Sequence, residues 1–460
     1  MKSSFDVCNP ATGQVIERVI DGTVEDAVRA VDAAAAAFPG WAATPARARS
    51  DILRRCHELM LRDADVLAAL ISTENGKSIV DARAEVVYAA EFYRWFSEEA
   101  VRGEGSYSEA PAGGVKTLVT HVPVGVAALI TPWNFPAAMA ARKVAPALAA
   151  GCTVVLKPAE ETPLTALALG RIMLEAGVPP GAVNIVPTTS APAVVSAWLA
   201  HDRVRKISFT GSTGVGRALL RQAADRVINA SMELGGNAPF VITADADVDA
   251  AVAGAMIAKF RGSGQACTAA NRFYVHADVV DEFLEKFGNA VMALRVGPSS
   301  DPESQVGPVI SSRALARIAA LVEAAIADGA RIAFQGKIPN SGLFYPPTLL
   351  VNVPFGAQIL SEEIFGPVAP IVTWTDESAM LASANNTEFG LAGYVYAGRL
   401  QDALRIGEQI AVGMVGINRG IVSEPAAPFG GVKQSGIGRE GAHEGIREYQ
   451  ETRVYSVDWA

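Results

Sequence analysis

The sequence predicts an α/β fold built on a parallel, doubly wound sheet. Between residues 124 and 242, short apolar runs alternate with segments whose apolar positions recur at helical spacing. This alternation is typical of a parallel sheet with helices on both faces. The chain has 460 residues, half of them hydrophobic, which is more than one ordinary core holds, so two or three domains are expected.

Three helices are expected before this region. Apolar residues at helical spacing cover 24–38, and Pro39-Gly40 marks the expected end of the first helix. A second helix is expected at about 50–72, before the break Glu74-Asn-Gly-Lys77. An aromatic-rich helix then continues to about Arg102.

The segment that follows these helices differs in composition. Residues 103–114 are rich in Gly, Ser and Pro, and residues 115–122 alternate between apolar and polar like an exposed antiparallel strand. Because this insertion separates the helical region from the α/β region, it is a candidate oligomerisation arm.

Elements of the α/β region can be placed from their apolar patterns. Strands are expected at 124–130, 153–156, 183–186, 206–209 and 240–242, and helices near 137–149, 162–176, 191–199 and 214–225. Further along, helices are expected at about 278–294 and 312–328, and strands near 331–334, 368–374 and 452–459. Ligands on parallel sheets bind beyond the carboxyl ends of the strands, so the residues after each strand are the first candidates for a site.

Polar residues and glycines follow three of these strands. Asn134 follows the first, Lys157 and Glu160 follow the second, and the turn Gly211–Gly216 follows the fourth. This turn enters a helix, where backbone N–H groups can hold a pyrophosphate. Its spacing is not GxGxxG, so a plain tight turn is an equal alternative, and the two charged residues alone could be solvated surface groups.

Cys267 is the candidate nucleophile. Gly262 and Gly264 precede it and let the backbone approach a reacting group closely. Glu233, which stands before a glycine pair, is a candidate general base toward water. A thiol is the strongest side-chain nucleophile, although a cysteine is also among the residues that most often simply pack in a core.

A protease is the competing interpretation of the cysteine segment. Gln265-Ala-Cys267 resembles the caspase pattern, but that pattern needs a glycine two residues after the cysteine, where Ala269 stands. No histidine stands out as a paired base. A cysteine and an acid without histidine, after a nucleotide-like α/β region, favour covalent aldehyde oxidation over proteolysis.

Composition excludes several classes of partner. The net charge of −9 and the pI near 5.3 argue against nucleic acid and against anionic membranes.

The four cysteines lie far apart without CxxC spacing, which disfavours a disulfide framework and a thiolate zinc site and favours a reducing cytoplasm. The five histidines show no HExxH spacing, so no metal is expected. We expect neither a signal peptide nor a membrane span, since prolines interrupt the uncharged stretch 122–141.

Seven motifs, taken together and in order, resemble the NAD(P)-dependent aldehyde dehydrogenase superfamily over nearly the whole chain. They are Pro132-Trp-Asn-Phe-Pro, Lys157-Pro-Ala-Glu, Phe209-Thr-Gly-Ser-Thr, Glu233-Leu-Gly-Gly-Asn, Gly264-Gln-Ala-Cys, Glu363-Ile-Phe-Gly-Pro and Pro428-Phe-Gly-Gly-Val-Lys. Three segments (157–167, 259–273 and 430–449) are most similar to succinate-semialdehyde dehydrogenases.

The resemblance implies an aldehyde dehydrogenase-like architecture with three parts. They are a Rossmann-type cofactor domain (1–103 and 124–234), an α/β catalytic domain (235–435) and a small β oligomerisation arm (104–123 and 445–460). The family assembles as homodimers or homotetramers, so the same is expected of this chain.

The resemblance also implies a role for each matching residue. Cys267 is the nucleophile, Asn134 and the Cys267 backbone N–H are the oxyanion donors, Glu233 is the general base, and Lys143 supports the base. Cofactor contacts are implied at Thr131, Trp133, Lys157, Glu160, Gly211, Ser212, Glu363 and Phe365, and substrate contacts at Arg142, Arg261, Ser423 and Phe429.

The implied reaction is the NAD(P)-dependent oxidation of an aldehyde to an acid through a cysteine thiohemiacetal and a thioester. Arg142 and Arg261 match positions that bind a distal carboxylate, a group that guanidinium recognises with two parallel hydrogen bonds. Succinate semialdehyde is therefore the expected substrate. The alternative substrates are glutarate semialdehyde, 2-oxoglutarate semialdehyde and a general aldehyde. The two arginines could instead be ordinary surface cations, and the chain could be a catalytically silent protein on this fold. A CoA-dependent relative is disfavoured, because Glu233 would then be expendable.

Three positions refine these expectations. Glu424, in the loop 421–427, could repel a substrate carboxylate. Ala269 stands where many relatives have a second cysteine, so no redox switch is expected. Glu160 favours NAD, with NADP as the alternative, because an acid near the ribose repels a 2′-phosphate.

Overall fold

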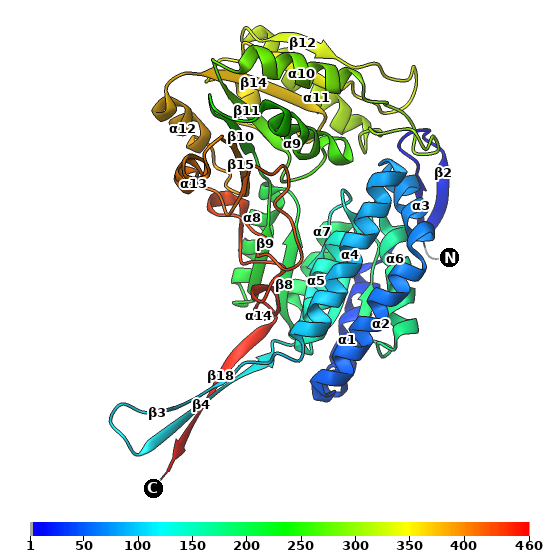
Figure 1. Cartoon of the computed structure of the whole chain (residues 1–460). Helices are drawn as coiled ribbons and strands as arrows, with labels where there is room; N and C mark the ends of the chain where they lie inside the picture. Colours follow the sequence, from blue (N-terminus) through cyan, green and yellow to red (C-terminus); the bar gives the residue numbers. More distant parts are fainter. Residues whose placement is uncertain (1–2, 460) are drawn as a thin grey trace.

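Four sheets organise residues 3–459, the part of the chain that the computed structural model describes. A six-stranded and a seven-stranded sheet are the centres of two α/β units, and a three-stranded sheet extends away from them as an arm with the C-terminus at its tip (Figure 1). β1 (Ser4–Cys8) and β2 (Val15–Ile20) form a separate hairpin. Within 3–459 no helix has the length and apolarity that crossing a membrane requires.

The six-stranded sheet confirms the predicted parallel arrangement. Its order is β17 (Gly436–Ile437), β9 (Asn229–Glu233), β8 (Val204–Thr210), β5 (Val126–Ile130), β6 (Thr153–Lys157), β7 (Val183–Ile185), and only β17 is antiparallel. The predicted helices are α5 (Pro136–Ala150), α6 (Pro163–Ala176), α7 (Ala191–Ala200) and α8 (Thr213–Ala224). Neighbouring residues of β6 pack into different cores: Val154 packs with α5 and α6, and Val155 packs with α1 (Val24–Ala43) and α7.

The prediction was wrong about the fifth strand. Residues 240–242 belong to β10 (Ala238–Ile242), which pairs with β11 (Ala270–His276) and β15 (Ala392–Tyr396) in the other sheet. The place beside β8 is taken by β9, a strand that the sequence pattern missed. Pairing across the chain, and not local pattern, therefore decides which sheet a strand joins.

The seven-stranded sheet has one antiparallel edge strand and six parallel strands. Its order is β12 (Arg331–Gln335), β13 (Thr348–Val351), β14 (Val368–Trp374), β11 (Ala270–His276), β10, β15 (Ala392–Tyr396), β16 (Met414–Ile417). Its helices are α9 (Val248–Phe260), α10 (Val280–Met292), α11 (Ser312–Ala327), α12 (Glu377–Asn385) and α13 (Leu400–Gln409). The helices and strands predicted between 278 and 374 are confirmed.

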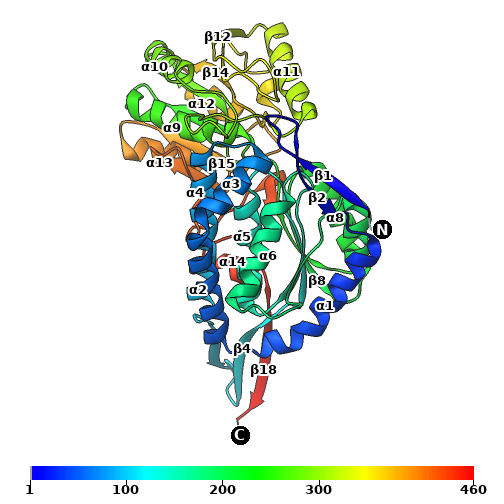
Figure 2. The same ribbon diagram turned by 90° about the vertical axis from the view of Figure 1, so that its right-hand side faces the viewer.

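The N-terminal helices correct two predicted boundaries. α1 (Val24–Ala43) continues through Pro39 because Trp41, only 1% exposed, packs its last turn into the core. The single helix expected at 50–72 is two, α2 (Ala46–Arg62) and α3 (Ala64–Asn75). Asp63 leaves helical geometry between them and binds the Arg62 guanidinium instead. α4 (Ile79–Glu99) packs along α2 (Figure 2).

The arm contains β3 (Ser106–Glu109), β4 (Val115–Pro123) and β18 (Gln450–Asp458), with β4 in the middle. The strands expected at 115–122 and 452–459 are confirmed. β3 was missed because Gly and Ser conceal its pattern. Tyr107, Leu118 and Tyr455 are exposed and lie side by side in register across the three strands. The domain boundaries given above stay a prediction.

Candidate active site

A cavity of about 580 Å³ lies at the carboxyl ends of the parallel strands. Its walls come from the loops after β5, β8 and β9, from α4, and from the segment 261–268 before β11. Predicted site residues on these walls are Trp133, Asn134, Arg142, Gly211, Ser212, Arg261, Cys267, Glu363, Phe365, Ser423 and Phe429. The other predicted residues, Thr131, Lys143, Lys157, Glu160 and Glu233, lie outside the cavity wall.

The turn before Cys267 directs the sulfur into the cavity. After α9, Gly262 and Ser263 take left-handed φ values of 58° and 59°, which end the helix abruptly. The carboxylate of Asp81 on α4 accepts a hydrogen bond from the Gly262 N–H at 2.8 Å and ties this turn to the helix. A Cβ at Gly236 would lie 2.1 Å from the Cys267 carbonyl oxygen, so only glycine fits there.

Cys267 is a partly exposed free thiol. Burial of the sulfur raises its pKa to about 12; the charge of Glu363 adds to this, and the guanidinium of Arg142 opposes it. The resting sulfur is therefore a thiol at neutral pH, and it must lose its proton before it can act as a nucleophile.

Asn134, in the loop between β5 and α5, contacts the segment that carries Cys267. Its amide nitrogen donates to the carbonyl of Gln265 at 2.9 Å, which fixes the side-chain orientation. An amide nitrogen carries two N–H groups, so one remains for a ligand in the cavity.

Glu233 lies behind the cavity wall at the end of β9. Neither carboxylate oxygen has a hydrogen-bond partner among the described residues, and burial, followed by the charge of Glu440, raises its pKa well above the usual range. Lys143 binds Glu440 and also donates to Ser208 at 2.8 Å. A Cβ at Gly430 would lie 2.9 Å from Glu233 Oε1, so this glycine leaves room for the carboxylate. Burial and the charge of Glu440 thus favour the protonated form of Glu233, and the charge of Lys143 opposes this.

Arginines line the cavity near Cys267. The Arg142 guanidinium donates to Ser423 at 3.1 Å, also bonds Tyr88, and lies 3.9 Å from the centre of the Phe429 ring. Arg261 has no ion pair or hydrogen bond from its side chain within residues 3–459; its only aromatic contact is with Phe135, at 5.6 Å. The cavity thus contains an arginine that makes no ion pair with any residue of 3–459. A carboxylate is the matching ligand.

The acidic residue expected to disturb this region does not lie on the cavity wall. Ser423 lies on the cavity wall, whereas Glu424 is exposed and is not part of the wall. Its carboxylate therefore does not face a ligand in the cavity.

Further residues on the cavity wall and outside it fit a dinucleotide. Ser212 is the N-cap residue of α8, but its side chain makes no capping hydrogen bond. The first N–H groups of the helix can therefore bind an anion, and the space beside Gly214 is open. Trp133 and Phe365 form an edge-to-face pair with ring centres 5.4 Å apart. Burial raises the pKa of Glu363 to about 7, and Lys157 pairs with Glu160 at 3.1 Å.

Four residues of the site were missed. Asp81, Tyr88, Gln265 and Glu440 touch residues far away in the chain, and no local pattern marks such contacts. Two had a nearby signal: Gln265 stands in the motif Gly264-Gln-Ala-Cys267, and Glu440 directly follows Arg439 at the end of a glycine-dense loop.

Comparisons with known proteins agree with this geometry. Residues 1–455 match the model of the aldehyde dehydrogenase family. The succinate-semialdehyde dehydrogenase of Paenarthrobacter nicotinovorans is 53% identical over 96% of this chain and 99% of its own length. The glutarate-semialdehyde dehydrogenase of Pseudomonas putida is 46% identical over 99% of this chain and 94% of its own. The crystal structure of an E. coli NADP-dependent enzyme superposes with a TM-score of 0.97 at 45% identity, covering 99% of this chain and 95% of that one.

Proposed function

Because the chain belongs to the aldehyde dehydrogenase family, we propose that it oxidises an aldehyde with a distal carboxylate, with succinate semialdehyde as the preferred substrate and NAD(P) as the oxidant. The observation that carries this proposal is that Arg261, on the same cavity wall as Cys267, has no ion-pair partner among residues 3–459. Arg142, held by Ser423 and Tyr88, adds a second guanidinium at this wall.

The residues of the cavity support a covalent mechanism. The Cys267 sulfur, once deprotonated, attacks the aldehyde carbon, and the oxyanion that forms accepts hydrogen bonds from the Asn134 amide and the Cys267 backbone N–H. Each such donor is worth about 3 kcal/mol in the transition state. A bound nicotinamide would supply the hydride acceptor, and loss of the hydride from the attacked carbon would leave a thioester on Cys267.

Glu233 completes the reaction. As a carboxylate it takes a proton from the water that attacks the thioester, and the acid product leaves Cys267 as a thiolate. Its raised pKa makes it a stronger base than an ordinary carboxylate. Lys143 stabilises the ionised form, while Glu440 opposes it.

The cofactor contacts would come partly from the cavity wall and partly from residues outside it. Backbone N–H groups at the start of α8 would hold the pyrophosphate, and Lys157 and Glu160 would bind the ribose near the adenine. Trp133, Glu363 and Phe365 would lie along the nicotinamide half, with Thr131 behind them. We propose a preference for NAD, because the Glu160 carboxylate would repel a 2′-phosphate.

The arm supports assembly with further copies of the chain. The row Tyr107, Leu118 and Tyr455 is exposed, and a three-stranded sheet with no core beneath it gains stability when another surface covers it. We therefore propose a homodimer or homotetramer joined through this arm. All four cysteines are free, which supports a cytoplasmic location.

The test is a comparison of kcat/KM for succinate, glutarate and 2-oxoglutarate semialdehydes and for an uncharged aldehyde of similar length, with each cofactor. We expect at least about a tenfold preference for a carboxylated substrate, which is about 1.4 kcal/mol of transition-state discrimination. A preference for glutarate semialdehyde would change only the chain length, whereas a preference for the uncharged aldehyde would overturn the proposal. A higher kcat/KM with NADP would refute the NAD preference.

A further inference from the structure

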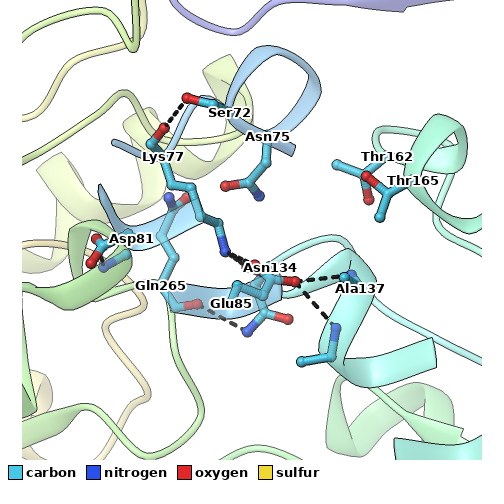
Figure 3. Close-up of polar contacts among 12 residues, drawn as sticks. Ser72, Asn75, Lys77, Asp81, Glu85, Asn134, Ala137, Thr162, Thr165 and Gln265 are labelled. Carbon is cyan, nitrogen blue, oxygen red and sulfur yellow. Dashed lines mark hydrogen bonds and ion pairs between the residues drawn. The ribbon is translucent and has the colours of Figure 1, made fainter. Parts of the chain in front are cut away.

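A buried ion pair outside the predicted site contacts the loop that carries Asn134. The pair consists of Lys77, between α3 and α4, and Glu85, on α4 (Figure 3). The two residues are only 2% and 3% exposed. Two buried charges cost desolvation free energy that their attraction often fails to offset, so stability alone does not explain the pair.

Lys77 fixes the backbone on one side of the Asn134 amide. Its ammonium group donates to the Asn134 carbonyl at 2.7 Å and lies 4.0 Å from the centre of the Phe135 ring. The hydroxyl of Ser72 holds the Lys77 carbonyl at 2.7 Å, and the side chain of Asn75 donates to the Trp133 carbonyl at 2.9 Å. The connection between α3 and α4 therefore holds residues 133–135 at several points.

Glu85 fixes the backbone on the other side. Its Oε1 accepts hydrogen bonds from the N–H groups of Ala137 at 2.9 Å and Ala138 at 3.3 Å, in the first turn of α5. The N-cap residue of α5, Phe135, has no side-chain oxygen that could cap the helix, so the Glu85 carboxylate supplies the cap from α4. Asn134 thus lies between two anchored segments, and its own amide reaches Gln265 beside the nucleophile.

We propose that Lys77 and Glu85 are positioning residues that aim the Asn134 amide at the oxyanion on the carbon bound to Cys267. The inference rests on the proposed function, in which Asn134 is that donor. A misplacement of about 1 Å can cost on the order of 100-fold in rate, so a rigid support for the amide has kinetic value.

The chain offers a matched control for a merely structural helix cap. Glu74 is fully buried and accepts from the N–H groups of Leu164 at 2.8 Å and Thr165 at 2.9 Å at the start of α6, but it has no hydrogen bond to residues 131–136. Glu74→Gln therefore removes the same kind of group from the same kind of helix end.

The test uses acyl transfer from p-nitrophenyl acetate, which needs no cofactor. The Cys267 sulfur bonds to the acetyl carbon, p-nitrophenolate leaves with the electron pair of the broken C–O bond, and the first-turnover release rate reports oxyanion stabilisation. Lys77→Met and Glu85→Gln are each measured alone and combined with Asn134→Ala. Alkylation of Cys267 by iodoacetamide, a displacement that forms no oxyanion, is measured in parallel.

We expect each positioning variant to slow acyl transfer at least about tenfold when Asn134 is present, and by less than about twofold in the Asn134→Ala background. Alkylation should stay within about twofold, and Glu74→Gln should leave both rates unchanged. Equal losses in both backgrounds, a parallel loss of alkylation, or an equal loss in Glu74→Gln would overturn the inference.

Failure of the underlying function gives a different result. If Asn134→Ala alone leaves acyl transfer unchanged, Asn134 is not an oxyanion donor, and the proposed function itself loses that role. If Lys77→Met does not fold, Glu85→Gln decides the inference alone, because it keeps the side-chain shape and one acceptor oxygen for α5.

Discussion

The guanidinium of Arg142 donates a hydrogen bond to Oγ of Ser423 at 3.1 Å, although 281 residues separate the two in the chain. The contact joins α5 to the loop 421–427, and Tyr88 on α4 bonds both partners. Three elements distant in sequence thus fix one cation at the cavity wall. Arg261, by contrast, has no such partners, and this difference determines which arginine is the better one to mutate.

Arg261→Ala is expected to lower kcat/KM for succinate semialdehyde about tenfold or more. The kcat/KM for the uncharged aldehyde should stay nearly unchanged, because only the carboxylated substrate loses a charged hydrogen bond. Steady-state kinetics with both substrates measures this. Arg313→Ala is the matched control, since Arg313 lines the same cavity but is exposed. Equal losses in the two variants would mean that overall charge, and not the position of Arg261, attracts the substrate.

Glu233→Gln is expected to retain the first turnover of reduced cofactor and to lose steady-state turnover, because the thioester would form but would not be hydrolysed. In the wild type the base acts in its ionised form, and burial raises its pKa above 4.5. Hydrolysis should therefore speed up as the pH rises through that raised pKa. Stopped-flow absorbance of the reduced cofactor over a pH series measures both effects; a variant with normal steady-state turnover would contradict the role.

Glu74 is expected to make the stability depend on pH. Burial raises its pKa from 4.5 to about 7 in the folded chain, against hydrogen bonds from Thr165 and Leu164 that lower it. Its contribution is therefore fully present below pH 4.5 and is lost as the pH rises through about 7. Compared with Glu74→Gln, the wild type should lose roughly 3 kcal/mol of unfolding free energy across this window. Urea unfolding at a series of pH values tests this, and a constant difference between the two proteins would contradict it.

Leu118→Glu is expected to weaken assembly, because it places a charge in the middle of the exposed row on the arm. Light scattering over a range of concentrations should give a smaller mass than for the wild type. Val66→Glu, at an exposed valine on α3, is the control and should leave the mass unchanged. A Leu118→Glu protein with the wild-type mass would show that the arm is not the interface.

Local patterns predicted those parts of the fold that local physics decides. The alternation of buried strands and helices gave the parallel sheet, because both periods can be recognised in the residues themselves. The path of α1 through Pro39 depends on the burial of Trp41 against other helices. The place of β10 depends on pairing with strands that come later in the chain. Neither is encoded within one window of sequence.

The candidate site also contains residues that local patterns predicted and residues that only the packing of distant elements brings in. Motifs directly after strands predicted Asn134 and the α8 turn, because strand ends meet at one edge of a sheet. The glycines before Cys267 and the chemistry of its thiol predicted the nucleophile. Lys77 and Glu85 reach that edge from another layer, and their contacts arise only from the packing of α4 against α5. An ordinary buried charge pair has no sequence signature, so the structure was needed to find it.

Mass spectrometry of Glu233→Gln after mixing with NAD and succinate semialdehyde tests the central claim most directly. Since this variant should stop after the first turnover, we predict a succinyl adduct on the peptide that contains Cys267, and no adduct in a second protein that also carries Cys267→Ala. Reduced cofactor formed while Cys267 stays unmodified, or full turnover by Cys267→Ala alone, would contradict the account.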